Sequence, residues 1–258
     1  YGIYIMILLN GDCLSILKDI PSNSIDLIFC DLPYGALPKQ EWDKKIDLDK
    51  LWIELIRLRK DSHTPIFFTT TTKFGVEIIN SAPKLTPFRY DLIYKKTNST
   101  GHLRSGSQPL RLHELIYVFY EKLPFYDKSK HTYKWDKDPK VSGVNPLYKA
   151  KSVVRDSAYG KVSSTDLVLG ESNAQSRYEP PLPVSILEFK SVKGSHKTEK
   201  PVSLLEWIVS YYSKVGDTIL DPTMGCGSTG QACKNLDREF IGIELNEEFF
   251  DIAKQRLT

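Results

Sequence analysis

Ile25-Asp26-Leu27-Ile28-Phe29-Cys30, followed directly by Asp31-Leu32-Pro33-Tyr34, is the stretch that decides the fold of this chain. An apolar run of this length that ends in a turn predicts a buried strand. A loop at the carboxyl end of such a strand is where open α/β sheets place their ligands. Asp31 and the carbonyl of Leu32 can accept hydrogen bonds from an amino group. Pro33 fixes the backbone before Tyr34, whose ring offers a flat face for stacking. The loop therefore suits the exocyclic amino group of a nucleobase that has left its helix.

A second turn, from Asp221 to Gly230, contains the spacing G-x-G-x-x-G between an expected strand and an expected helix. Glycines permit a tight turn and close approach of a ligand, and the helix N-terminus offers unpaired N–H groups. Glu244 lies 23 residues after Asp221, at the end of the next expected strand. Its carboxylate can accept both hydroxyls of a ribose, although a surface strand end is the plain alternative. The pattern predicts a site for a cofactor that contains a nucleoside.

Apolar periodicity predicts an α/β fold with a parallel sheet covered on both faces. The expected strands are 3–9, 25–30, 65–70, 90–95, 114–121, 217–221 and 239–244, and the expected helices lie within 14–20, 48–60, 76–79, 201–212, 231–236 and 249–257. Only 28 residues follow Gly230. A dinucleotide-binding fold needs several further βα units after its glycine turn. The remaining strands must therefore come from the N-terminal part, which makes the order of this Rossmann-like sheet circularly permuted.

Composition excludes several classes of protein. The chain has 258 residues, is 41% hydrophobic and 26% charged, and carries a formal net charge of +3. These are ordinary values for a globular protein, and no run approaches the roughly 18 apolar residues of a membrane span. The four cysteines show no C-x-x-C spacing, so we expect free thiols in a reducing compartment and no metal site.

Charge is unevenly distributed along the chain. Residues 95–161 contain 14 Lys or Arg and 6 Asp or Glu, a net charge of +8, which leaves −5 for the rest. Aromatic residues are interleaved in this segment, a pattern that favours contact with a phosphate backbone, with a solvated basic face as the alternative. Periodicity is lost between 122 and 195. We therefore expect a catalytic and cofactor-binding domain at 1–121 and 196–258, with an inserted, loop-rich region at 122–195.

These motifs, in this order, resemble those of the DNA amino-methyltransferases that use S-adenosylmethionine, in the β arrangement found in restriction-modification systems and phages. Asp31-Leu32-Pro33-Tyr34 resembles their D-P-P-Y motif, and 221–230 resembles their D-P-F-x-G-S-G-T cofactor loop. The segment 196–201 is similar to their H-P-T-x-K-P segment, and 11–13 to their opening G-D-C segment. Leu32, Lys197 and Thr223 depart from the family pattern at single positions. The resemblance covers about 7–121 and 195–258.

The resemblance implies transfer of a methyl group from S-adenosylmethionine to N6 of adenine in a specific sequence of double-stranded DNA, with base flipping. It makes 122–195 the target-recognition region and implies a bacterial or phage-infected host cytoplasm, often with a homodimer and without membrane contact. The implied catalytic residues are Asp31, Leu32, Pro33 and Tyr34. The implied cofactor-binding residues are Asp12, Cys13, Asp31, His196, Thr198, Lys200, Pro201, Asp221, Pro222, Thr223, Gly225, Gly227, Ser228, Glu244 and Leu245.

Other interpretations stay open at this point. Asp12 could be only a helix N-cap. Cytosine-N4 methylation is the nearest alternative function, because both bases present an amino group; in this family Asp at position 31 is associated with adenine and Ser with cytosine. RNA is a further substrate class, since single-stranded bases need no flipping. A nicotinamide-dependent oxidoreductase and a non-catalytic DNA-binding protein are alternatives from other classes.

Overall fold

The computed structural model describes residues 4–35, 44–102, 105–133, 152–157, 160–165, 178–191 and 199–258. Within these ranges the chain divides into two compact units. The first comprises 1–127 and 184–258, and the second comprises 128–183. The predicted insertion boundaries at 122 and 195 lie outside those of the second unit. No helix within the described ranges is long and apolar enough to cross a membrane.

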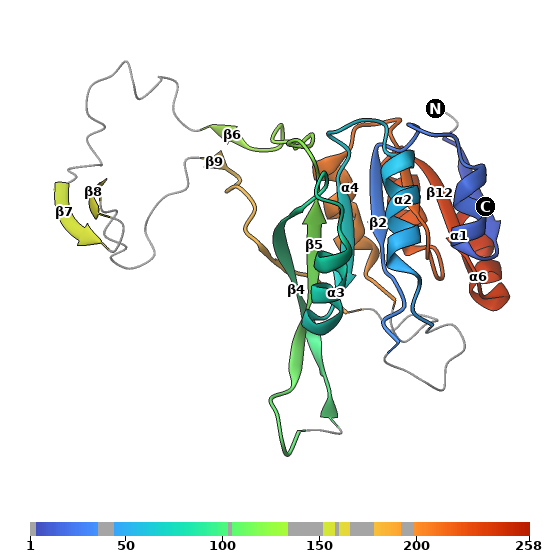
Figure 1. The fold of residues 1–258 in the computed structure, drawn as a ribbon, viewed down its shortest axis with the longest axis horizontal. Coiled ribbons are helices and arrows are strands. Elements are labelled where there is room, and N and C mark those ends of the chain that lie inside the picture. Colours follow the sequence, from blue (N-terminus) through green and yellow to red (C-terminus); the bar gives the residue numbers. More distant parts are fainter. Residues whose placement is uncertain are drawn as a thin grey trace. The chain divides into compact units, whose positions relative to one another are not determined.

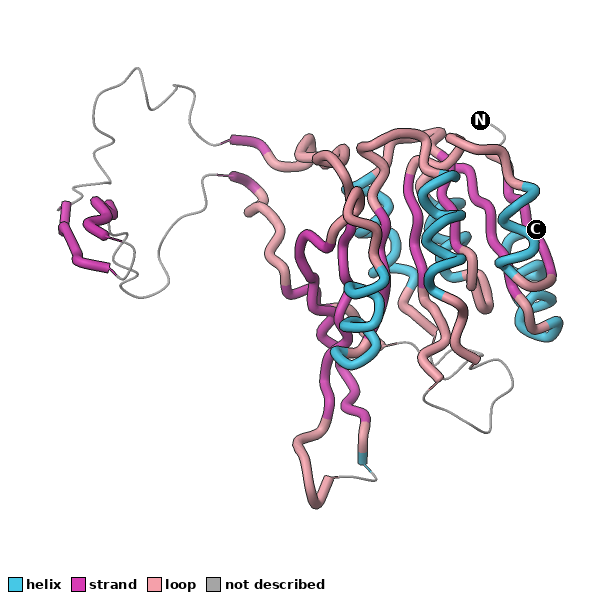
Figure 2. Tube along the Cα trace, in the orientation of Figure 1, coloured by secondary structure: helices cyan, strands magenta, loops and turns pink. Residues whose placement is uncertain are grey.

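The first unit is built on an eight-stranded sheet in the order β1-β12-β11-β2-β3-β5-β4-β10 (Figures 1 and 2). Its strands are β1 (Met6–Asn10), β2 (Leu27–Cys30), β3 (Ile66–Thr70), β4 (Phe88–Thr100), β5 (Arg111–Phe119), β10 (Ile186–Glu188), β11 (Thr218–Asp221) and β12 (Glu239–Glu244). The C-terminal strands β11 and β12 lie between β1 and β2, so the order is permuted as predicted. Strand β2 pairs directly with β11, which places both predicted loops at neighbouring strand ends.

The prediction of a wholly parallel sheet is wrong at β5, which runs antiparallel to both β3 and β4. No α-helix lies between β4 and β5 among the described residues, and the chain turns back as a hairpin. A second correction concerns β10, which the sequence placed in the inserted region. It pairs in parallel with β4 and buries Leu187. A strand of only three residues is too short to show a period, so hydrophobic periodicity could not predict it.

Helices cover both faces of the sheet. One face carries α1 (Cys13–Ile16), the 3-10 turn η1 (Leu17–Asp19), α2 (Leu48–Leu58) and α3 (Thr72–Ser81). The other carries α4 (Val202–Tyr212), α5 (Ser228–Asn235) and α6 (Glu247–Leu257). Strand β2 serves both cores because its side chains alternate. Leu27 and Phe29 face the α4 side, whereas Ile28 and Cys30 face the α2 side.

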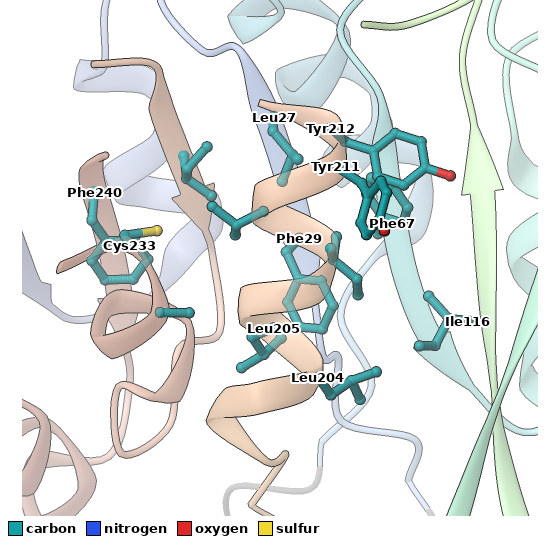
Figure 3. Close-up of a cluster of buried hydrophobic side chains, with 14 of the residues drawn as sticks. Leu27, Phe29, Phe67, Ile116, Leu204, Leu205, Tyr211, Tyr212, Cys233 and Phe240 are labelled. Carbon is teal, nitrogen blue, oxygen red and sulfur yellow. The ribbon is translucent and has the colours of Figure 1, made fainter. Parts of the chain in front are cut away.

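The hydrophobic core beneath α4 packs against the strands β2 and β3. Figure 3 shows Leu204 and Leu205 of α4 beside Phe29 of β2, with Phe67 and Tyr212 packed against one another. All of these side chains are buried. At about 25 cal/mol per Å² of apolar surface, such burial supplies most of the driving force that fixes the strand ends. The Asp31 loop therefore stands on a rigid base.

The second unit contains two short antiparallel pairs. Strands β6 (Thr132–Tyr133) and β9 (Tyr178–Glu179) form one, and β7 (Ser152–Ser157) and β8 (Gly160–Thr165) form the other. In the described part of this unit His131 is buried, and its Nδ1 lies 2.9 Å from the carbonyl oxygen of Pro180. The role in target recognition that the resemblance implies for this region stays a prediction.

Candidate functional site

A cavity of about 240 Å³ opens where the carboxyl ends of β2, β11 and β12 meet. Two groups of side chains line it. The Asp31–Tyr34 loop lies on one side, and the glycine turn after Asp221 lies on the other. The two loops follow directly paired strands and line the same cavity, so a ligand in this cavity can contact both loops. This is the position that open α/β sheets use for ligands.

The Asp31 carboxylate is held from several directions. Its Oδ1 accepts a hydrogen bond from the Thr69 hydroxyl of β3 and lies 3.4 Å from the Tyr34 hydroxyl. Its Oδ2 accepts a 2.7 Å hydrogen bond from Nζ of Lys200. Each carboxylate oxygen has two lone pairs, so Asp31 can still accept from an incoming amino group. The packed partners fix its orientation before a substrate arrives.

Lys200 is the buried cation of the site, with a side chain that is only 8% exposed. Its Nζ also lies 3.4 Å from Oε2 of Glu114 on β5, and Glu114 pairs in turn with Lys96 on β4. Burial alone would lower the pKa of Lys200, but the charges of Asp31 and Glu114 raise that pKa well above its usual range. Burial would likewise raise the pKa of Glu114, yet Lys200 and Lys96 lower it. Lys200 and Glu114 therefore stay ionised, and basic and acidic side chains alternate along the contacts from Asp31 through Lys200 and Glu114 to Lys96.

Asp221, at the end of β11, is held differently. It is 2% exposed, and its carboxylate accepts from the Thr229 hydroxyl at 2.6 Å and from the backbone N–H of Thr223 at 3.1 Å. No cation is among these partners. Burial raises the pKa of Asp221 to about 7, although both hydrogen bonds oppose that rise. Asp221 thus ties the glycine turn to the first turn of α5.

Glu244 closes the cofactor side of the cavity at the end of β12. Its Oε2 accepts from the backbone N–H of Gly225 at 2.9 Å, and its Oε1 accepts from that of Asn246 at 2.8 Å. Burial raises the pKa of Glu244, and these backbone hydrogen bonds lower it in part. The carboxylate is thereby fixed at the cavity wall. Its second lone pairs can accept from the two hydroxyls of a ribose.

For Asp12 the sequence left two interpretations open, a helix N-cap and a cofactor-binding residue. Its Oδ2 accepts from the backbone N–H of Ser15 at 3.1 Å, so it is the N-cap of α1. It also lines the cavity together with Cys13. Burial raises the pKa of the Cys13 thiol to about 12, and all four cysteines are buried and unpaired. These thiols are therefore protonated and inert as nucleophiles.

The structure brings most of the predicted site residues to this cavity. Those that line it are Asp12, Cys13, Asp31, Leu32, Pro33, Tyr34, Lys200, Asp221, Pro222, Thr223, Gly225, Ser228, Glu244 and Leu245. Pro201 and Gly227 are not in the lining; they are the N-caps of α4 and α5, and Gly227 has a φ of 81° that favours glycine. His196 and Thr198 lie outside the described residues.

Glu199, Thr69 and Lys44 are among the residues at or near the cavity that the sequence analysis did not assign to the site. Glu199 is 4% exposed, pairs with Arg256 at 2.8 Å and accepts from the Ser228 hydroxyl at 2.8 Å. It occupies the variable position of the H-P-T-x-K-P pattern, so a motif match could not single it out. Thr69 is the last residue but one of β3 and belongs to no recognisable motif. Lys44 lies in a segment without hydrophobic periodicity. Only the pairing of β2 with β3 shows that Thr69 reaches Asp31.

Comparison with known proteins gives consistent matches. The family model N6_N4_Mtase, described as DNA methylase, matches residues 25–255. The chain is 27% identical to the Type II methyltransferase M.HinfI of Haemophilus influenzae, over 97% of this chain and 67% of that protein. It is also 27% identical to the Type II methyltransferase M2.LlaDCHI of Lactococcus lactis subsp. cremoris, over 98% of this chain and 89% of that protein.

Solved structures agree at the level of fold. The M1.HpyAVI–SAM complex aligns with a TM-score of 0.62 at 21% identity, over 98% of this chain and 100% of that one. The PvuII DNA methyltransferase, described as cytosine-N4-specific, aligns with a TM-score of 0.64 at 13% identity, over 100% of this chain and 88% of that one. At such identities the likeness speaks for the shared mixed α/β fold alone.

Proposed function

The chain belongs to the N6_N4_Mtase family of DNA methylases, and from that premise we propose that it methylates N6 of adenine in double-stranded DNA. Its methyl donor is S-adenosylmethionine, the donor that the family uses and that a structural neighbour holds. The observation that supports the proposal most directly is one of geometry. The Asp31 loop and the glycine turn end two paired strands and line a single cavity.

The residues of the cavity fit this donor. S-adenosylmethionine carries a cationic sulfonium and a ribose, and the lining supplies the carboxylates of Asp12, Asp31 and Glu244. Glu244 is placed to accept from the ribose hydroxyls. The N-terminus of α5, with Ser228 in the cavity wall, suits the negative end of the amino-acid part.

Asp31 and the Leu32 carbonyl are the proposed acceptors for the two amino protons of the target base. The lone pair of this nitrogen is delocalised into the ring, so the amine is a poor nucleophile. Two hydrogen bonds to fixed acceptors favour a more pyramidal nitrogen and stabilise the positive charge that develops on it. Preorganised electrostatic stabilisation of this kind is usually the largest catalytic effect.

When bound, S-adenosylmethionine supplies an electrophilic methyl group. The nitrogen forms a bond to the methyl carbon as the carbon–sulfur bond breaks, and one amino proton leaves to solvent. Tyr34 positions the flipped base by stacking, a contact worth about 1–3 kcal/mol per base. Its ring packs on Phe74 at 5.5 Å between centroids. Burial raises the pKa of the Tyr34 hydroxyl beyond the physiological range, so it acts as a neutral group.

Adenine rather than cytosine is proposed because position 31 carries a carboxylate. In this family Asp at that position is associated with adenine and Ser with cytosine. A carboxylate is a stronger hydrogen-bond acceptor than a hydroxyl, and the carboxylate of Asp31 is paired with Lys200. Cytosine-N4 methylation is the second candidate function, because its substrate presents the same kind of amino group.

The test is methylation of a duplex DNA library with labelled S-adenosylmethionine, followed by mass analysis of the nucleosides and sequencing that detects modified bases. We expect N6-methyladenine in one sequence context. N4-methylcytosine would overturn the choice of base, and label in RNA alone would overturn the choice of nucleic acid. Asp31→Ala should abolish incorporation while cofactor affinity stays within a few-fold. Unchanged incorporation in that variant would overturn the mechanism.

A further inference from the structure

Strands β4 and β5 continue beyond the rest of the sheet as a two-stranded ribbon (Figures 1 and 2). Strand β10 pairs with β4 only at 93–95, and β3 pairs with β5 only at 115–119. Residues 96–114 therefore have no neighbouring strand on either side among the described residues, and near their start Thr97 exchanges two hydrogen bonds with Ser191, which follows β10. We call this segment the arm. An isolated hairpin gains little stability in water, so its projection indicates a role other than support of the core.

The arm is exposed and lacks acidic residues over most of its length. Every described residue from 105 to 110 is exposed, as are Thr97, Asn98 and His113. From Lys96 to His113 the sequence contains three Lys or Arg and two His, but no Asp or Glu; the one acid of the arm is Glu114, at its base. Ser, Thr, Asn, Gln and Gly make up most of the remainder. A basic, hydroxyl- and amide-rich ribbon is complementary to phosphate and to base edges.

The base of the arm is connected to the proposed catalytic carboxylate. The first and the last residue of the arm, Lys96 and Glu114, form an ion pair across the hairpin. Glu114 lies 3.4 Å from Nζ of Lys200, which in turn lies 2.7 Å from Asp31. Strand β4 is also parallel to β2, because both β3 and β4 run antiparallel to β5. The arm therefore leaves the sheet at the same edge at which the cavity opens.

The dimensions of the arm match a DNA groove. Five residues of β4 beyond Lys95 rise about 17 Å at 3.4 Å per residue. The major groove is about 12 Å wide and 8.5 Å deep, and it admits a two-stranded ribbon. Leu110 and Leu112, each 40% exposed, give the ribbon apolar contacts of the kind that thymine methyl groups accept.

From this geometry we infer that the arm binds duplex DNA in the major groove beside the base that enters the Asp31 loop. The inference rests on the proposed function for its choice of nucleic acid. It adds to the catalytic unit a DNA-contacting element that is separate from the region 122–195. The occupant is DNA because the arm beyond its Lys96–Glu114 ion pair is basic and contains no Asp or Glu, and because the arm projects beside the cavity that takes the target base under the proposed function.

Site-specific crosslinking tests the inference directly. All four native cysteines are buried, so a cysteine introduced at the exposed Asn98 can be labelled selectively with a photoactivatable crosslinker. Lys18→Cys is the matched control; Lys18 is exposed on η1, which leads towards the amino end of β2. With duplex DNA and S-adenosylhomocysteine present, we expect Asn98→Cys to crosslink to DNA and Lys18→Cys not to do so. Crosslinking to a second protein chain, or no excess over the control, would overturn the inference.

Charge reversal provides an independent measurement. Arg111→Glu should weaken duplex binding by roughly 5- to 100-fold and reduce the slope of log affinity against log salt by about 1. Lys18→Glu makes the same change in net charge and should alter both quantities little. Cofactor affinity should be equal in all three proteins, which also shows that the catalytic unit is folded. Equal DNA affinities for the two variants would overturn the inference.

The two proposals fail in different ways. If wild-type protein methylates DNA but the Asn98 and Arg111 variants behave like the Lys18 controls, the arm inference fails and the proposed function stands. If Asn98→Cys crosslinks to DNA while wild-type protein methylates no base, the arm inference stands and the proposed function fails.

Discussion

Asp31 and Asp221 end two strands that pair directly with one another, yet their surroundings differ in kind. Asp31 is held by side chains, and one of them is the buried cation Lys200. Asp221 is held by the Thr229 hydroxyl and a backbone N–H, with no cation among its partners. The first carboxylate belongs to a network of alternating charges, whereas burial raises the pKa of the second to about 7.

Under the proposed function, the difference separates a group that faces substrate from a group that holds a turn. A carboxylate that accepts hydrogen bonds from an amine in a site without water is stabilised by a buried counter-ion, and Lys200 is placed to act as one. A carboxylate that only ties a turn to a helix can accept hydrogen bonds whether or not it carries a proton on its other oxygen. The same residue type at adjacent strand ends thus serves two purposes.

The largest effect is expected from Asp31→Asn, which removes the charge but keeps the shape. The amide loses the charged acceptor and leaves Lys200 with one carboxylate fewer. We expect turnover to fall by 10²–10³-fold or more, the usual cost of losing one preorganised electrostatic group. Single-turnover methylation measures this, and Asp221→Asn serves as the matched control. If both Asn variants lost activity equally, the contrast between the two carboxylates would be wrong.

Lys200→Met tests the same contrast by removing the cation that pairs with Asp31. The change leaves Asp31 and Glu114 buried without their shared partner. Breaking a buried pair in this way costs about 3–5 kcal/mol in the free energy of unfolding. Chemical denaturation measures the loss. Lys50→Met is the control, because the Lys50–Asp47 pair is exposed to solvent and contributes little to stability. A loss no larger than in the control would show that the network is not a source of stability.

Asp221→Asn should change how stability depends on pH. The folded-state pKa of Asp221 is about 7 and the unfolded value is 3.8. Between these values the folded state binds more protons, so wild-type stability falls as pH rises. Asn mimics the protonated acid and removes that fall. We expect the variant to match wild type near pH 4 and to gain on the order of 2–4 kcal/mol by pH 8. Thermal unfolding across this range is the measurement, and parallel curves would contradict the expectation.

Glu244→Gln should give the smallest of the four effects. It weakens two charge-assisted hydrogen bonds from backbone N–H groups and the proposed contact to the ribose. Hydrogen bonds to charged groups contribute about 1.5–3 kcal/mol, so cofactor affinity should fall by roughly 10- to 100-fold. Titration calorimetry with S-adenosylhomocysteine measures this. The control is Glu239→Gln at the opposite end of β12. Equal cofactor affinity in the Glu244→Gln and Glu239→Gln variants would show that Glu244 does not contribute to cofactor binding.

The elements that depend on patterns of neighbouring residues could be predicted from the sequence. The apolar run before Asp31 and the glycine turn after Asp221 are local signals, and both loops lie where strand order requires. The contact between Lys200 and Asp31 could not be predicted, because the two residues lie 169 positions apart and only packing joins them. The arm escaped for another reason. Its polar residues show no alternation, so the expected strands ended at 95 and began again at 114 although β4 and β5 extend from 88 to 100 and from 111 to 119.

The permuted strand order has a consequence for how the chain is made. During synthesis β2 emerges early, but its partner β11 lies at 218–221 and follows almost all of the described first unit. Until then one edge of a fully buried, apolar strand has no neighbour, and such an edge is a template for aggregation. The sheet cannot close until β11 and β12 have left the ribosome, so the pairing of β2 is completed late in the synthesis of this unit.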